Sequence, residues 1–296
     1  MRLARLSLVL LIFWHNLKPM RRDVLELRQF YSTALGQRVR ELVSRKLVQA
    51  WGDGRGLDVL GLGYATPYLE LFRSRARRCL ALMPAAQGVE VWPSKAPRLS
   101  CLSEEAALPL PNALFDRVVL IHALEESLDP LAFLQETMRV LAPSGRVIVV
   151  AANRRGPWAN AEATPFGHGQ PFTRRQLETL VRAAGLEPAA WSRALYLPPL
   201  NALARWADVF EPLGARLWPG LSGLILLEAV KQTYAIKPRA KPARVRVALP
   251  GLARPGAIGQ TLPPSRQIHS LHARSWRFGG FGLRLGRRAL GRRNTL

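Results

Sequence analysis

Cysteine is scarce in this 296-residue sequence, and the two that occur, Cys79 and Cys101, cannot form a disulfide framework or a cysteine-rich metal site. Both lie in apolar runs, so we expect two buried free thiols. Buried thiols without disulfides suit a reducing compartment. The sequence therefore predicts no metal site and a cytoplasmic protein.

Long hydrophobic runs are also lacking, because a membrane-spanning helix needs ~20 consecutive apolar residues. The nearest candidate lies in residues 1–19, where a basic start precedes apolar residues 6–14 but no small-residue cleavage site follows. Met20 then directly precedes a helix-like segment. We expect residues 1–19 to be an extension ahead of the native start, with peripheral membrane association through this segment as the alternative.

Acidic residues are missing from both ends of the chain. Residues 235–296 contain 14 Lys/Arg and no Asp or Glu, whereas residues 20–234 contain 26 Lys/Arg and all 20 acids. The net charge of +23 therefore belongs mainly to the C-terminal segment. Its composition predicts a basic disordered tail, which would contact nucleic acid or an anionic membrane only weakly and without specificity.

Between the two ends, apolar strands alternate with helices. Residues 23–50 have the apolar spacing of amphipathic helices. Near-continuous apolar runs then predict strands, and the stretches between several of them predict helices; the runs are 56–62, 78–83, 98–102, 115–124, 145–153, 189–199 and 222–234. Strands of this kind imply an α/β fold with a mainly parallel sheet that is covered on both faces.

The most specific stretch is "FDRVVLIHALEESLDPLAFLQETMRVLAPSGRVIVV", residues 115–150, which follows a glycine loop and an "ALP" segment. Together they resemble the class I S-adenosylmethionine-dependent methyltransferases, and most closely the type 11 group. The resemblance implies a Rossmann-like domain over residues 20–234. It also implies a seven-stranded sheet with an antiparallel last strand, and a substrate-side insert at about 198–220. The implied function is methyl transfer from S-adenosylmethionine to a small-molecule or lipid-like acceptor.

The glycine loop "VLGLGYATPYL" departs from the family pattern. The resemblance places Gly61 where the family has an acid, and Gly63, Ala65 and Pro67 where it has glycines. Using Asp58 as the acid would misplace Gly63, so the first alignment is preferred. Pro67 is compatible with the first turn of a helix, which has no use for its missing N–H. We expect Gly63 to pass close to the cofactor, where a side chain would intrude.

Further cofactor contacts follow from the same resemblance. Met83 stands where the family has the acid that binds the ribose hydroxyls, and losing such an acceptor weakens binding by about 1.5–3 kcal/mol per hydrogen bond. Glu104 or Glu105 stands where an acid contacts the adenine amino group, and His122 closes the fourth strand. A nicotinamide cofactor is disfavoured, because the loop has only G-x-G-x-x-T and Met83 replaces the expected acid.

Candidate substrate-side residues follow the fifth strand. They are Asn153, Arg154 and Trp158, with His168 as the candidate catalytic base, since an imidazole accepts a proton near neutral pH. Loop anchoring and solvated charge are the alternative roles. Because Gly61 and Met83 replace both usual acids, the alternative function is a catalytically silent, methyltransferase-like binding protein. The sequence identifies neither the acceptor nor the oligomeric state.

Overall fold

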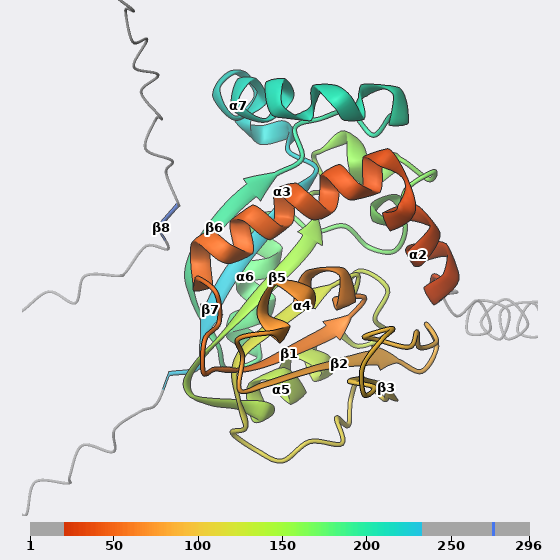
Figure 1. The fold of residues 1–296 in the computed structure, drawn as a ribbon. Helices are drawn as coiled ribbons and strands as arrows, with labels where there is room; N and C mark the ends of the chain where they lie inside the picture. Colours follow the sequence, from red (N-terminus) through yellow and green to blue (C-terminus); the bar gives the residue numbers. More distant parts are fainter. Residues whose placement is uncertain (1–20, 233–273, 276–296) are drawn as a thin grey trace, which may run out of the picture.

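The computed structural model describes residues 21–232 and the pair 274–275 (Figure 1). The predicted extension, residues 1–19, lies outside the described residues. The predicted disordered tail also lies outside them, except for the pair 274–275.

One mixed sheet forms the centre of the fold, with strand order β3-β2-β1-β4-β5-β7-β6-β8. Strands β1 to β5 pair in parallel, and β7 is antiparallel to both β5 and β6, so the predicted fold and its antiparallel last main strand are confirmed. The two-residue β8 pairs in parallel with β6. The strands are β1 Asp58–Gly63, β2 Arg78–Pro84, β3 Ser100–Ser103, β4 Phe115–Ile121, β5 Leu141–Ala152, β6 Glu187–Ala194, β7 Leu224–Val230 and β8 Arg274–Ser275.

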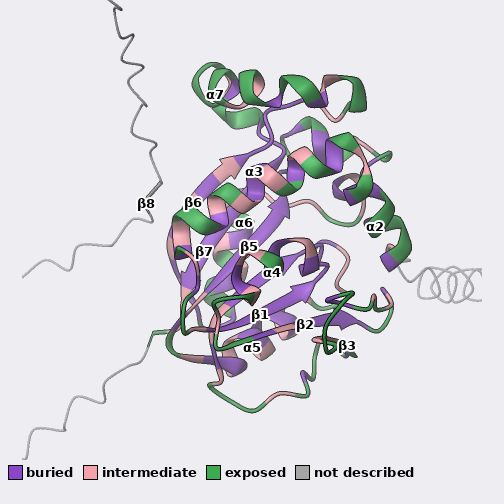
Figure 2. Cartoon of the chain, viewed as in Figure 1, coloured by how far each residue is buried: buried purple, intermediate pink, exposed green. Residues whose placement is uncertain are grey.

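Helices cover both faces of this sheet, which explains why the central strands are apolar almost throughout (Figure 2). Successive residues of β1 enter different cores: Val59 packs on the side of α2, α3 and α4, whereas Leu60 packs on the side of α5 and α6. The helices are α2 Val24–Ser32, α3 Ala34–Trp51, α4 Thr66–Arg73, α5 Pro130–Val140, α6 Arg174–Ala183 and α7 Ala207–Leu217. Short 3-10 turns are η1 Pro157–Asn160, η2 Pro165–Gly167, η3 Asn201–Trp206 and η4 Pro219–Leu221.

The N-terminal helices are positioned by side-chain caps. Asp23 accepts the Leu25 N–H at 2.7 Å and starts α2, while Thr33 ends α2 and accepts the Gly36 N–H at 3.0 Å to start α3. The chain therefore bends at one residue. This bend carries α2 from α3 toward the ends of β1, β2 and β4 (Figure 1).

The turn from β1 into α4 depends on Gly63. Its φ of +77° is in the left-handed region, and a Cβ there would collide with the backbone of Ile121 and His122 at the end of β4. The next residue, Tyr64, donates its N–H to the Ile121 carbonyl at 2.8 Å. The structure shows that this glycine is also required by the close contact between two strand ends, and its contact with the cofactor stays a prediction.

We predict that Gly63→Val lowers the free energy of unfolding by roughly 2–5 kcal/mol, because it adds left-handed strain to a backbone collision. Urea unfolding measures the change. The matched control is Gly56→Val, since Gly56 has a φ of +72° and nothing within 4 Å of an added Cβ. Equal losses in the two variants would show that the contact with β4 is unimportant.

Candidate functional site

The candidate site lies at the carboxyl ends of β1, β2, β4 and β5, with residues 21–31 across it (Figure 1). Val24 donates its N–H to the Gln87 carbonyl at 2.8 Å, just past β2. The buried Arg21 guanidinium contacts Glu105 and the Ala123 carbonyl oxygen. The N-terminal segment therefore closes over this edge of the sheet.

A buried aromatic cluster fills the space under α2. Tyr68 donates to the Tyr31 hydroxyl at 2.9 Å, and the Tyr31 hydroxyl lies 2.9 Å from Nε2 of His122. Tyr31 also stacks on Tyr64, with ring centroids 5.6 Å apart, and His122 packs on Phe166 at 4.4 Å. These contacts join α2 to the glycine loop, the end of β4 and the loop after β5.

His122 is neutral at physiological pH. Burial, and then the positive charges of Arg21 and Arg22, lower its pKa to about 3. A neutral imidazole accepts on one ring nitrogen, so Nε2 can accept a hydrogen bond from the Tyr31 hydroxyl. The predicted position of His122 at the end of β4 is correct, and its φ of +49° turns the chain there.

Gly61 does not face open space. A Cβ at this position would lie 2.6 Å from Ala65 Cβ and 2.7 Å from Leu69 Cδ1, so α4 packs directly against the strand. Asp58, the alternative acid, lies at the opposite end of β1 and pairs with Arg77. Asp58 therefore lies away from the candidate site, which agrees with the preferred alignment.

Glu90 is a carboxylate at the glycine loop that the sequence analysis missed. Its two oxygens accept hydrogen bonds from the Tyr64 hydroxyl, at 3.1 Å, and from the Thr66 hydroxyl at the start of α4. It follows Met83 by seven residues, in a stretch without helix or strand period. The only signal was a single acid in the loop after β2.

The other predicted cofactor residues differ in exposure. Met83 is fully buried at the end of β2, in contact with the apolar core. Glu104 is exposed, whereas Glu105 contacts Arg21 and accepts a hydrogen bond from the Ser127 hydroxyl at 2.5 Å. Of the predicted acidic pair, Glu104 is therefore the one that is open to a ligand.

Glu125 is a second group that the sequence analysis missed. It is 6% exposed, its Oε1 accepts the Ala152 N–H at 2.9 Å, and its Oε2 has no partner among the described residues. Burial raises its pKa to about 7, with a smaller contribution from Glu126. A carboxyl with this pKa at the ends of β4 and β5 can exchange a proton near neutral pH.

The predicted substrate-side residues anchor the loop after β5. The Asn153 amide donates to the Ser222 carbonyl at 2.7 Å, and the buried Trp158 indole donates to the Leu197 carbonyl at 2.7 Å. Arg154 is exposed and donates to the Pro171 carbonyl at 3.0 Å. The His168 ring contacts Arg22 and the Glu162 carbonyl oxygen, so it joins this loop to the N-terminal segment. Their catalytic and binding roles remain predictions.

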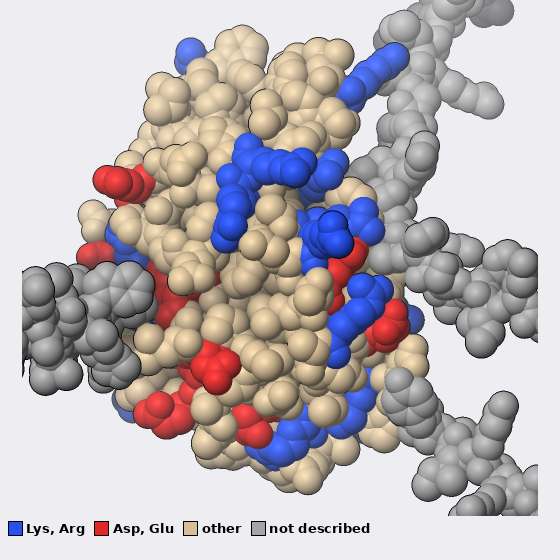
Figure 3. All heavy atoms as spheres, turned by 180° about the vertical axis from the view of Figure 1, so that it is seen from behind, with Lys and Arg blue, Asp and Glu red and all other residues tan. Residues whose placement is uncertain are grey.

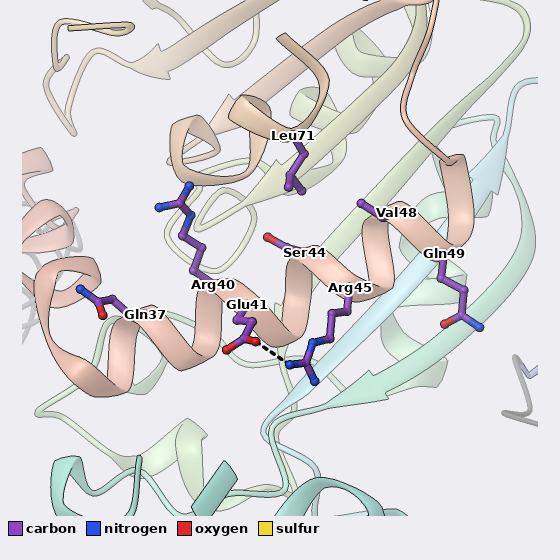
Figure 4. A pocket seen from close by; sticks show the side chains of 8 residues that line it. All are labelled: Gln37, Arg40, Glu41, Ser44, Arg45, Val48, Gln49 and Leu71. Atoms are coloured by element: carbon purple, nitrogen blue, oxygen red, sulfur yellow. Dashed lines mark hydrogen bonds and ion pairs between the residues drawn. The ribbon is translucent and has the colours of Figure 1, made fainter. Parts of the chain in front are cut away.

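Two cavities open on the described surface. One, of about 420 Å³, lies between the loop after β5 and the insert, with Tyr196, Phe210 and Trp218 on its walls and Arg155 beside it. The other, of about 730 Å³, is a groove between α3 and α4, where Arg40 and Ser44 face Leu71 (Figure 4). Neither cavity is lined by any of the predicted site residues, but the first lies next to Arg154 and Trp158 in the sequence.

Residues 21–232 contain no cluster of three His, Cys, Asp or Glu side chains that could hold a metal ion. None of the helices in this part of the chain is long and apolar enough to cross a membrane.

Cys79 is buried as expected, but Cys101 is exposed, so the expectation for Cys101 was wrong. β3 pairs only with β2 among the described strands, so residues of an apolar edge strand reach solvent.

Residues 57–149 match the family described as "Methyltransferase domain". An uncharacterised protein of Mycobacterium tuberculosis is 30% identical over 193 residues, which cover 63% of this chain and 60% of that protein. A protein of Mycolicibacterium smegmatis named as a probable S-adenosylmethionine-dependent methyltransferase is 32% identical over 136 residues, 45% of this chain and 52% of that protein. The chain thus spans about 60% or less of the length of these two relatives.

Among solved structures, an S-adenosylmethionine-dependent methyltransferase from Thermotoga maritima has the same fold, with a TM-score of 0.53 and 17% identity. The alignment covers 71% of this chain and 96% of that one. The resemblance to the class I methyltransferases is therefore confirmed for the matched segment. S-adenosylmethionine is the cofactor of these methyltransferases.

We predict that Glu125 makes the folded chain less stable as the pH rises. The folded state keeps this proton up to about pH 7, whereas the unfolded chain loses it near pH 4.5, so the free energy of unfolding falls between these values. Glu125→Gln removes this dependence and gains about 3 kcal/mol relative to the unchanged protein across that window.

Urea unfolding at a series of pH values measures the difference. Glu70→Gln is the control for the direction of the effect. The Arg73 hydrogen bond lowers the pKa of Glu70, so replacing Glu70 changes the dependence of the unfolding free energy on pH in the opposite direction. Parallel profiles for Glu125→Gln and the unchanged protein would contradict the prediction.

Proposed function

We propose that this chain is an S-adenosylmethionine-dependent methyltransferase that acts on a small-molecule or lipid-like acceptor. The observation that carries the proposal is a buried polar side chain, Gln87, whose hydrogen-bonding groups are unused at the edge of the sheet where this fold binds its cofactor. The Gln87 side chain is 1% exposed, yet neither its amide nitrogen nor its oxygen has a partner among the described residues. Buried amides without partners are costly, so this one supports a bound ligand.

The residues present fit S-adenosylmethionine by a different route from the usual pair of acids. Glu90 offers a carboxylate beside the glycine loop, where the cofactor's amino group or ribose hydroxyls would bind, and Glu104 offers a second one for the adenine amino group. The bound cofactor supplies a methyl group that carries the positive character of its sulfonium. Residues 21–31 cover the edge, so they must be displaced for the cofactor to enter, and on return they would exclude water.

Two groups near the ends of β4 and β5 are candidates to accept the proton that the acceptor loses. His168 was the predicted base, and Glu125 is a second candidate because its pKa of about 7 suits proton transfer at neutral pH. The cavity lined by Tyr196, Phe210 and Trp218 supports an acceptor with an aromatic or aliphatic body. Methyl transfer itself requires alignment of the reacting atoms and no covalent enzyme intermediate.

We predict that the full chain binds S-adenosylhomocysteine in calorimetry and that Glu90→Gln weakens this binding about 10- to 100-fold. The reason is the loss of charge-assisted hydrogen bonds, each about 1.5–3 kcal/mol. Glu70→Gln is the matched control, because Glu70 is a carboxylate of α4 that pairs with Arg73 on the surface. Its affinity should stay at the value of the unchanged protein.

Three results of these experiments would each overturn a different part of the proposal. Absence of binding by the unchanged chain would overturn the proposed function. Binding that Glu90→Gln leaves unaltered would overturn only the role of Glu90. Binding without transfer of a labelled methyl group to cell extracts would favour the predicted alternative, a catalytically silent binding protein.

A further inference from the structure

The insert between β6 and β7 has an unusual surface. Among the described residues, twelve large apolar side chains are exposed, and six of them lie between residues 200 and 221. We call these six the insert surface; they are Leu200, Trp206, Val209, Leu213, Leu217 and Leu221. Figure 1 shows that α7 projects from one end of the sheet, and Figure 2 shows that much of it is exposed.

The pattern of α7 is reversed relative to an ordinary surface helix. Trp206, Val209, Leu213 and Leu217 are spaced by three and four residues, so they lie on one face. That face is outside: Leu217 is 62% exposed and Val209 is 53% exposed. The buried residues of α7 are instead the small Ala207 and Gly214, and a Cβ on Gly214 would collide with the Tyr196 ring. Packing within the domain therefore does not explain the large apolar side chains.

The acids and the arginines of the insert differ in their partners. Asp208 faces Arg45 and Arg38 of α3, with an Arg45 N to Asp208 O distance of 3.4 Å, and Glu211 accepts the Tyr196 N–H at 2.7 Å. Arg205 and Arg216 are exposed, and neither has an acidic partner among the described residues. From behind, the upper end of the molecule shows Lys or Arg at its edges between uncharged side chains (Figure 3).

We propose that the insert surface docks on a lipid bilayer that carries anionic headgroups. An apolar helix face with tryptophan at one end and arginine near both ends suits the boundary between acyl chains and headgroups. Because the two acids of the insert are engaged within the domain and its two arginines have no acidic partner among the described residues, an anionic membrane is favoured over a neutral one. Leu221 belongs to the insert surface and also lines the cavity of Tyr196, Phe210 and Trp218, so this cavity adjoins the proposed membrane side.

The proposal does not depend on methyl transfer, and vesicle sedimentation of the full chain tests it. Vesicles of phosphatidylcholine mixed with phosphatidylglycerol should bind the unchanged protein. The double variant Leu213→Ser, Leu217→Ser should lower the vesicle partition coefficient by about tenfold or more, because it removes apolar area from the interface. The matched control is Leu102→Ser, Leu128→Ser, which alters two exposed leucines outside the insert and should bind as before.

Charge is tested separately. Arg205→Gln, Arg216→Gln should weaken binding to the mixed vesicles and leave binding to pure phosphatidylcholine unchanged. The basic segment 235–296 is the same in every variant, so a difference in binding between variants comes from the insert surface. Unfolding temperatures within the range of the control confirm that the variants are folded.

Two results would overturn the proposal. One is equal vesicle binding by the unchanged protein and by the Leu213→Ser, Leu217→Ser variant. The other is a dimer in lipid-free solution that this variant splits, since a second copy of the chain would then cover the insert surface.

Discussion

The contact between the ends of β1 and β4 determines the geometry of the whole candidate site. Gly63 lies against the backbone of Ile121 and His122, and the Tyr64 N–H binds the Ile121 carbonyl. Because this contact fixes the loop, it also fixes the start of α4 and the side chain of Tyr64. Tyr64 in turn positions Glu90 through its hydroxyl and Tyr31 through ring stacking. One backbone contact thus aligns groups from four separate segments.

The two positions that the resemblance matches to the family's acids have uncharged residues in this chain. Gly61 and Met83 place no carboxylate between the strand ends, and the imidazole of His122 is neutral. Of the acids at the site, Glu90 and Glu104 lie farther out in the loops after β2 and β3, whereas Glu125 is buried at the ends of β4 and β5. A ligand that enters would therefore meet uncharged aromatic groups beside the glycine loop, and carboxylates around them.

The sheet was predictable because its central strands are buried on both faces and contain little but apolar residues. β1, β4 and β5 were recognised in this way, whereas the antiparallel direction of β7 came from the family resemblance. Cys101 was misjudged because β3, with a single partner among the described strands, exposes apolar residues that a central strand would bury. Glu90 and Glu125 were missed because their roles depend on contacts with Thr66 and Ala152, distant in sequence.

The reversed pattern of α7 has a consequence for motion. In α7 only Ala207 and Gly214 are fully buried and Phe210 packs partly against the core, so this helix removes less apolar area from water than α5 does. By contrast, α5 buries Phe133, Leu134 and Val140 and is held firmly. The amides of α7 should therefore exchange with solvent through local opening, long before the sheet itself unfolds. Such opening would expose α7 while the residues of the insert that belong to the core, Ala204 among them, stay packed against the domain.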